Sequence, residues 1–329
     1  MAVEANNLGP IFVPEVARHS PTFTLLRARR RDTPEGLDIA LCGVPTDFTT
    51  TQRVGSRYGP AQAREYSRMI RPGHAVTRVF PFLLARIADV GDAPVDPLAV
   101  DWTIDSIQTF FEGIAAAGAR PLAIGGEHTI TLPILRAIAQ PPAGPVGVVH
   151  IDAHPDTIDE IDGNRINTGT PFRRSVEEGL TDPTRHVMIG IRGTMYSTEE
   201  FDWALEQGMT IIGMDELEEM TAKGVVAKIR EVMGDRPVYV TIDLDGLDPA
   251  VLPGTNYPEP GGVSIRDAQI ILRGLRGLNV IGADVNELCP PADMSGNSAV
   301  VVVNLMFELL CVMAERVAAE RAAAAEQDG

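Results

Sequence analysis

Two short stretches of this chain place acidic and imidazole side chains at alternate positions directly after apolar runs. The first contains Asp152, His154 and Asp156, and the second contains Asp243 and Asp245. Side chains of an extended backbone alternate between two faces, so each set projects from one side. Carboxylates and imidazoles are ligands for divalent cations, and carboxylates are costly to bury beside an apolar strand without a cation. Each stretch taken alone could also be a solvated polar turn.

Two further motifs extend this pattern. His128 follows Gly125-Gly126-Glu127, whose glycines allow a tight turn and a close backbone approach, and Glu287 ends the stretch Asp284-Val285-Asn286-Glu287. Four carboxylates and two imidazoles are too many ligands for one catalytic zinc. They suit two Mn²⁺-like ions about 3.5–4 Å apart. The candidate ligands are His128, Asp152, His154, Asp156, Asp243 and Asp245.

The elements that must position these residues alternate between short apolar runs and longer amphipathic ones. This alternation predicts a three-layer α/β/α fold around a mainly parallel, eight-stranded sheet. The motifs all follow strands, at the sheet edge where open α/β folds bind ligands. We expect strands near residues 38–43, 87–91, 121–124, 146–151, 186–191, 210–213, 237–243 and 279–285. We expect helices near residues 60–69, 95–117, 132–139, 171–179, 197–208, 215–233, 264–274 and 298–321, with Ser264 as an N-cap.

Composition limits the organisation of the chain. We expect an N-terminal arm or irregular extension over residues 1–36, one domain over 37–321, and an acidic, Ala-rich tail over 322–329. The apolar stretch 299–313 is interrupted by Asn304 and Glu308, which argues against a membrane span.

The net charge argues against some partners, and the cysteine content argues against a fold held by disulfides. The 329 residues carry a formal net charge of −17, which argues against nucleic acid or an anionic membrane as a partner and is compatible with attraction of small cations. Three scattered cysteines are too few for a disulfide framework. The first twenty residues lack the pattern of a signal peptide, so we expect a cytoplasmic location.

Taken together, the motifs resemble the ureohydrolase family, which comprises arginases, agmatinases and guanidino-acid hydrolases. The resemblance covers residues from about Asp38 to the end of the final helix. The stretch Gly169-Thr170-Pro171-Phe172-Arg173-Arg174 is similar to the agmatinase-like branch. Other matching stretches are Gly125–His128, Asp152–Asp156, Asp243–Pro249, Pro253–Thr255, Pro258–Gly262 and Asp284–Glu287.

The resemblance implies a binuclear metal site. Asp152 and Asp243 would bridge the two ions. Mn²⁺ is the most common ion in the family, and Ni²⁺ is possible. The family also implies a homo-oligomer, either a trimer or a hexamer. The remaining ligands would be His128 and Asp156 on one ion and His154 and Asp245 on the other.

The resemblance also implies a reaction. Family members hydrolyse a guanidino group to urea and an amine through a hydroxide that bridges the two ions. Asp156 would hold that hydroxide by a hydrogen bond, and Glu287 would accept hydrogen bonds from the substrate guanidinium. A guanidinium is a poor electrophile, so the reaction needs a metal hydroxide and a well-placed carboxylate.

Two residues depart from the family pattern. Thr168 stands where a histidine usually precedes the Gly-Thr-Pro-Phe stretch, a position associated with proton transfer or substrate contact. Pro155 stands where a small or polar residue is usual. Both changes fall on the substrate side of the metal ligands. They indicate an unusual guanidino substrate, or else a low-activity or regulatory subunit of a mixed oligomer.

Loop charges leave the substrate open. Asp159, Glu160 and Asp162 follow the metal motif and favour a small cationic guanidine such as agmatine or a biguanide. Guanidinobutyrate or guanidinopropionate would instead need a basic residue, and Arg53 and Arg165 could serve. These side chains could equally be solvated loop charges.

Overall fold

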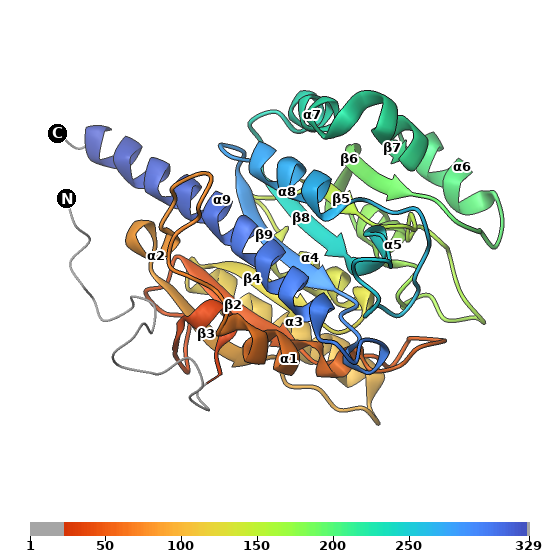
Figure 1. Ribbon diagram of the computed structural model, residues 1–329, viewed down its shortest axis with the longest axis horizontal. Coiled ribbons are helices and arrows are strands. Elements are labelled where there is room, and N and C mark those ends of the chain that lie inside the picture. The colour runs from red at the N-terminus through yellow and green to blue at the C-terminus, as the bar shows by residue number, and fades with distance from the viewer. Residues whose placement is uncertain (1–22, 328–329) are drawn as a thin grey trace.

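A central sheet of nine parallel strands runs through a computed structural model that describes residues 23–327 (Figure 1). The strand order is β1-β3-β2-β4-β9-β8-β5-β6-β7. Consecutive strands β4 and β5 are separated in the sheet by β9 and β8. The strands are β1 (Arg29–Arg30), β2 (Ile39–Val44), β3 (Ile87–Asp92), β4 (Arg120–Gly125), β5 (Val146–Ile151), β6 (Thr181–Ile191), β7 (Thr210–Gly213), β8 (Val238–Asp243) and β9 (Val280–Asn286).

The eight expected strands correspond to β2–β9, and the described structure has one strand more than predicted. The additional strand, β1, has two arginine residues that pair with Ala88 and Asp89 of β3. A two-residue strand without apolar side chains has no periodicity from which it could be predicted. It belongs to the first 36 residues, which we expected to be irregular.

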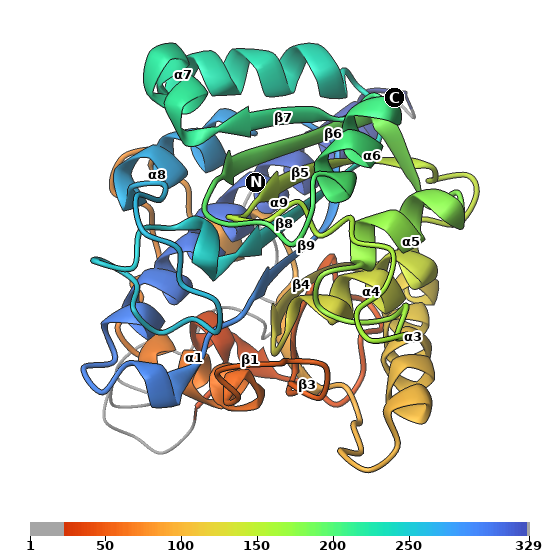
Figure 2. The same ribbon diagram turned by 90° about the vertical axis from the view of Figure 1, so that its right-hand side faces the viewer.

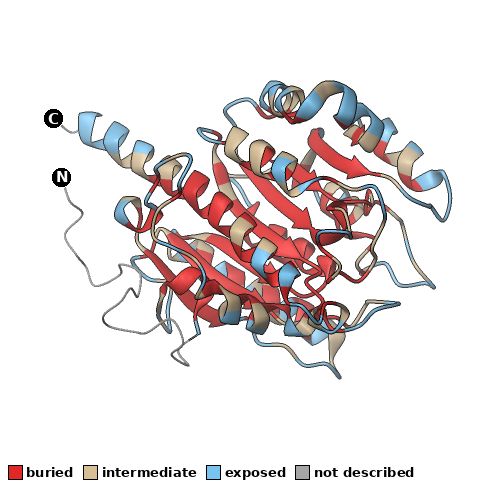
Figure 3. Ribbon diagram, in the orientation of Figure 1, coloured by how far each residue is buried: buried red, intermediate tan, exposed pale blue. Residues whose placement is uncertain are grey.

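Helices cover both faces of the sheet, as a three-layer architecture requires (Figure 2). One face packs against α1, α2, α7, α8 and α9, and the other against α3 and α4, with α5 and α6 near β6. The strands between them are largely buried (Figure 3). The helices are α1 (Gly59–Ser67), α2 (Pro81–Leu84), α3 (Val100–Ala116), α4 (Thr131–Ile138), α5 (Pro171–Glu177), α6 (Glu199–Glu206), α7 (Met214–Met233), α8 (Ile265–Gly274) and α9 (Asn297–Gln327).

Local signals explain where α8 begins. The Ser264 side chain accepts a hydrogen bond from the Asp267 backbone N–H at 3.0 Å, which confirms the predicted N-cap. The Ser264 hydroxyl in turn donates to the Asp267 carboxylate at 2.6 Å. This pair satisfies a backbone donor that the first turn of a helix leaves without a partner.

Part of the N-terminal segment packs onto the domain. Leu25 and Leu26 are fully buried, and their backbone N–H groups donate to Asp89 Oδ2 at 2.8 Å and to Ser67 Oγ at 2.9 Å. Residues 1–22 of the expected arm lie outside the described residues. At the other end, α9 continues to Gln327 with exposed side chains from residue 322, so the described part of the expected tail is helical.

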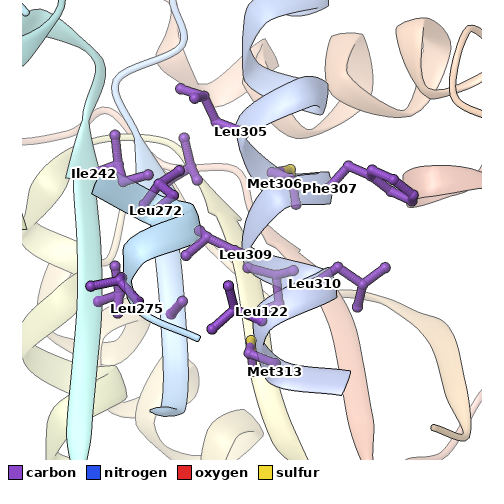
Figure 4. Close-up of a cluster of buried hydrophobic side chains, with 14 of the residues drawn as sticks. Leu122, Ile242, Leu272, Leu275, Leu305, Met306, Phe307, Leu309, Leu310 and Met313 are labelled. Atoms are coloured by element: carbon purple, nitrogen blue, oxygen red, sulfur yellow. The ribbon is translucent and has the colours of Figure 1, made fainter. Parts of the chain in front are cut away.

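Helix α9 supplies much of the core. By length and apolar composition this helix could cross a membrane, but 83% of its apolar 18-residue window is buried inside the protein. Leu309 of α9 packs toward Leu122 of β4 and Leu272 and Leu275 of α8 (Figure 4). The apolar character of α9 is therefore used for packing on the sheet.

Leu309→Ala tests that packing. We expect the free energy of unfolding to fall by about 2–5 kcal/mol, because a fully buried leucine would leave a cavity. Urea unfolding followed by circular dichroism measures the change. The control is Val300→Ala, on the exposed side of the same helix. An equal effect from both variants would contradict a core role for α9.

Candidate metal centre

The strand order brings the chemical motifs together at one edge of the sheet. His128 follows β4, Glu287 follows β9, Asp243 ends β8 and Asp152 follows β5, and these four strands are adjacent. All four strands are parallel, so their carboxyl ends meet. The site lies across the carboxyl ends of β4, β9, β8 and β5, the edge at which open α/β sheets bind ligands.

The first cluster surrounds His128. Its Nδ1 lies 2.8 Å from Asp156 Oδ2, 3.2 Å from Asp152 Oδ2 and 3.3 Å from Asp243 Oδ2. One ligand atom from each of the four residues lies within 4.8 Å of the others, and all four residues are buried. This convergence of one imidazole and three carboxylates can hold a divalent cation.

The second cluster shares Asp152 with the first. His154 Nδ1 lies 3.1 Å from Asp245 Oδ2 and 3.6 Å from Asp152 Oδ1. These three residues also meet as a candidate ion site, and His154 is the partly exposed member. Because Asp152 uses one oxygen in each cluster, two cations could lie side by side. The structure therefore brings together all six side chains predicted as ligands.

A chain of hydrogen bonds orients His128. Its Nε2 lies 2.8 Å from Thr241 Oγ1, and the Thr241 hydroxyl donates to Asp284 Oδ1 at 2.5 Å. The Thr241 oxygen therefore accepts the Nε2 proton, which leaves Nδ1 free to act as a ligand. Nδ1 is buried without a well-formed hydrogen bond in the described structure, as a ligand atom awaiting a cation would be.

Asp284 is itself held on several sides within the sheet. It accepts hydrogen bonds from Thr131 Oγ1 at 2.8 Å, from Asn286 Nδ2 at 2.7 Å and from the Tyr239 hydroxyl. A buried carboxylate with this many donors is fixed in position. His150 holds a ligand carboxylate in a similar way, because its Nε2 lies 2.7 Å from Asp152 Oδ2. Asp284, Thr241 and His150 had no predicted role.

Backbone geometry supports the site. Asp156 and Glu287 have positive φ angles of 51° and 67°, which non-glycine residues rarely adopt. Gly126 allows the predicted close approach, because a Cβ there would lie 1.9 Å from the backbone oxygen of Thr46. The ligand loops are thus held in conformations that an unconstrained chain would avoid.

The pKa shifts show that the cluster has an excess of negative charge. Burial and the charge of Asp152 raise the pKa of Asp156 to about 7. Burial and the neighbouring aspartates raise the pKa of Asp243 well above its usual range. Burial alone would lower the pKa of His128, but three surrounding carboxylates raise it well above its usual range. Protons here occupy positions that a divalent cation could take.

Glu287 is enclosed by hydrogen-bond donors. Its Oε1 accepts from the His128 backbone N–H at 2.8 Å and from Thr168 Oγ1 at 2.9 Å, and its Oε2 accepts from the Asn256 amide. The side chain is fully buried. Thr168, the residue at the departure from the family pattern, therefore contacts the predicted guanidinium-binding carboxylate directly.

A cavity of about 470 Å³ opens above the two clusters. His154, Asp156, Asp243 and Asp245 lie in its lining, with both unusual residues, Pro155 and Thr168. The sequence-based interpretation placed these two residues on the substrate side, and the lining agrees with it.

The predicted acidic rim lies elsewhere. Among the described residues, Asp159, Glu160 and Asp162 do not line the cavity. Asp159 instead pairs with Arg174 at 2.6 Å and with Arg165 at 3.2 Å. Sequence proximity to the metal motif did not reveal the direction of these side chains. These three carboxylates therefore give no support to a cationic substrate.

A loop tied to the site also lines the cavity. Buried Glu127 accepts hydrogen bonds from Phe48 N at 2.9 Å and Thr49 N at 2.8 Å. The Tyr257 hydroxyl accepts from Thr51 N at 2.7 Å. Thr51, Gln52 and Arg53 of this loop, with Tyr257, reach the cavity. Of these residues, only Arg53 had a predicted role.

A family model described as the arginase family matches residues 37–312, which is most of the chain. The chain belongs to the arginase family. It is 45% identical over 310 residues to guanidinopropionase of Pseudomonas aeruginosa, covering 94% of this chain and 97% of that protein. It is 44% identical over 298 residues to mitochondrial agmatinase of Gallus gallus, covering 91% and 87%.

Solved structures agree with this membership. Proclavaminate amidino hydrolase from Streptomyces clavuligerus superposes with a TM-score of 0.86 at 36% identity, covering 92% of this chain and all of that one. The arginase-like fold and the predicted ureohydrolase membership are therefore confirmed. This arginase-family protein is a hydrolase, and its relatives include proteins named guanidinopropionase and guanidino acid hydrolase.

Thr241→Val tests the orientation of His128. We expect metal content and metal affinity to fall about 10- to 100-fold, the usual effect of removing a hydrogen bond that orients a metal ligand. Elemental analysis and competition with a chelator measure both quantities. Thr241→Ser retains the hydroxyl and should keep the ion. Full metal retention by Thr241→Val would show that the chain does not orient the ligand.

Metal binding should also depend on pH. A cation must displace protons from His128 and Asp156, whose pKa values are raised without it, so apparent affinity should increase between pH 6 and pH 8. Each displaced proton changes the affinity by up to about tenfold per pH unit. Titration with Mn²⁺ in weakly buffered solution should release protons. An affinity that is independent of pH would contradict the proton competition.

Proposed function

We propose that this arginase-family hydrolase cleaves a small guanidino compound to urea and an amine at two divalent cations. The observation that carries the proposal is the pair of ligand clusters that share Asp152. Asp152 and Asp243 would contact both ions, with His128 and Asp156 on one and His154 and Asp245 on the other. Mn²⁺ is the ion we propose first, and Ni²⁺ is the alternative.

When bound, the two cations would supply a water of lowered pKa at neutral pH. Hydrolysis of a guanidino group would add a water oxygen to the guanidino carbon and break the bond from that carbon to the substituted nitrogen, and the departing amine would take up a proton. Asp156 lines the cavity and would hold the attacking water by a hydrogen bond. Burial and the charge of Glu127 raise the pKa of Glu287 well above its usual range. The Glu287 carboxylate, held by three donors, would favour a guanidinium at the base of the cavity, and that cation would in turn stabilise its charged form.

A guanidino acid is the substrate class that we propose first. Two cationic arginines line the cavity in the described structure, Arg53 and Arg192. The Arg192 guanidinium donates to the backbone carbonyls of Asp245 at 2.7 Å and Gly190 at 3.0 Å, so it is already engaged. Arg53 is exposed and is suited to a substrate carboxylate. Relatives named guanidinopropionase and guanidinobutyrase support this choice.

A cationic guanidine, such as agmatine or a biguanide, is the second candidate. Glu200 and Glu259 also line the cavity, and either carboxylate could face a distal amine. A relative named agmatinase supports this alternative. Arg165, the other predicted carboxylate partner, does not line the cavity and pairs with Glu177 at 3.0 Å.

Urea release tests the reaction. Protein loaded with Mn²⁺ or Ni²⁺ should produce urea from at least one of guanidinopropionate, guanidinobutyrate, agmatine, arginine, guanidine and a biguanide. Asp243→Ala should abolish release and lower the metal content, because Asp243 faces His128 in the first cluster. Absence of urea from every compound, with two ions bound per chain, would contradict the proposed reaction.

Arg53→Gln separates the two substrate classes in the same assay. Loss of the guanidinium should raise KM for the guanidino acids by up to about fivefold, the scale of an exposed ion pair. It should lower KM for agmatine, because a repulsive charge is removed. The opposite pattern would favour the cationic substrate.

The same measurements test the alternative of a low-activity or regulatory subunit in a mixed oligomer. That alternative was suggested by Thr168 and Pro155, and it predicts fewer than two ions per chain in metal-replete protein. All six proposed ligands and Glu287 are present and converge, which favours an active site. Elemental analysis, together with the mass of the purified assembly, distinguishes the two.

A further inference from the structure

We propose that Glu127 is a positioning residue that holds Arg53 at the cavity through the loop of residues 48–53. This inference rests on the proposed function, in which Arg53 contacts the carboxylate of a guanidino acid. The last three residues of the loop line the cavity. Glu127 is buried and directly precedes the proposed ligand His128 in the chain, so it links the metal centre to this loop.

Both oxygens of Glu127 accept hydrogen bonds from the start of the loop. Oε1 accepts from Phe48 N at 2.9 Å, and Oε2 accepts from Thr49 N at 2.8 Å and from the Thr49 hydroxyl at 2.6 Å. The Thr50 hydroxyl lies 3.3 Å from Oε2 as well. Burial raises the pKa of Glu127 to about 7. Because both oxygens face backbone donors, the loop favours the ionised carboxylate.

Other contacts hold the rest of the loop, but none of them replaces Glu127. The Gly55 backbone N–H donates to Asp47 Oδ2 at 2.7 Å, which joins the residues on either side of the loop. The Thr51 backbone N–H donates to the Tyr257 hydroxyl at 2.7 Å. Arg53 itself is exposed, so the loop backbone determines where its side chain begins. A fixed backbone lowers the entropy that an exposed arginine loses when it binds a carboxylate.

Glu127→Gln tests this role. The variant keeps the size of the side chain but replaces one acceptor oxygen with an NH₂ group that would face donors of the loop. We expect the amides of residues 48–51 to exchange faster with deuterium, as measured by mass spectrometry. KM for guanidinobutyrate or guanidinopropionate should rise by up to about fivefold, the scale of the Arg53 ion pair. Metal content and kcat should stay near the wild-type values, because Glu127 belongs to neither ligand cluster.

Two further variants keep the test decisive if Glu127→Gln does not fold. Thr49→Val removes one donor and leaves the backbone bonds, so it should shift loop exchange and KM in the same direction by a smaller amount. Glu308→Gln is the matched control, because Glu308 is a buried glutamate that pairs with His74 and Arg273. It should change neither loop exchange nor KM.

A double-mutant cycle shows whether Glu127 acts through Arg53. In the Arg53→Gln background, Glu127→Gln should add little to KM for the guanidino acids. In the wild-type background it should lower KM for agmatine, as Arg53→Gln does, whereas general damage to the cavity would raise KM for both classes. Full additivity of the two substitutions would overturn the inference. Loss of metal from Glu127→Gln would also overturn it, because the residue would then serve the metal centre.

Binding of γ-aminobutyrate separates this inference from the proposed reaction. This compound has a carboxylate but no guanidino group, so its affinity for metal-loaded protein can be measured by NMR without turnover. A wild type that releases no urea, but whose γ-aminobutyrate affinity depends on both Arg53 and Glu127, would contradict the reaction alone. An active wild type whose KM depends on Arg53 and not on Glu127 would contradict this inference alone.

Discussion

The central constraint on this structure is electrostatic: four aspartates converge on two histidines in a largely buried site. Asp152 uses its two oxygens in two clusters, so the negative charge cannot be separated by a local shift of one side chain. Without cations, protons take up this charge and the pKa values of Asp156 and Asp243 rise. Much of the surrounding hydrogen bonding, from Asp284 to Asn256, fixes side chains that would otherwise move apart.

The sequence alone predicted those features that depend on a local pattern of residues. Alternation at Asp152, His154 and Asp156 indicates one face of an extended backbone, and the structure brings these side chains together. Apolar runs located eight of the nine strands, and Ser264 marked the start of α8. Such features depend on neighbours in the chain, so no knowledge of tertiary contacts was needed.

Contacts between distant strands were not predictable in this way. Thr241 looks in the sequence like any other buried strand residue. Its role in orienting His128 follows only from the position of β8 beside β9, which places Thr241 next to Asp284. Glu127 is adjacent to a predicted ligand, but its partners lie about 80 residues away in the loop that begins at Phe48. Asp159 follows the metal motif, yet it turns toward Arg174 and away from the cavity. Proximity in sequence does not specify side-chain direction.

The distribution of the six ligands along the chain links cation binding to folding. They lie between residues 128 and 245, at or just after the carboxyl ends of β4, β5 and β8, which come together only when β4, β9, β8 and β5 have assembled in the correct order. An unfolded chain offers the same groups far apart, so it binds cations weakly. By mass action, each bound cation would therefore stabilise the native topology over alternative strand orders. The ions would thus favour the correctly assembled sheet, in addition to their part in the reaction.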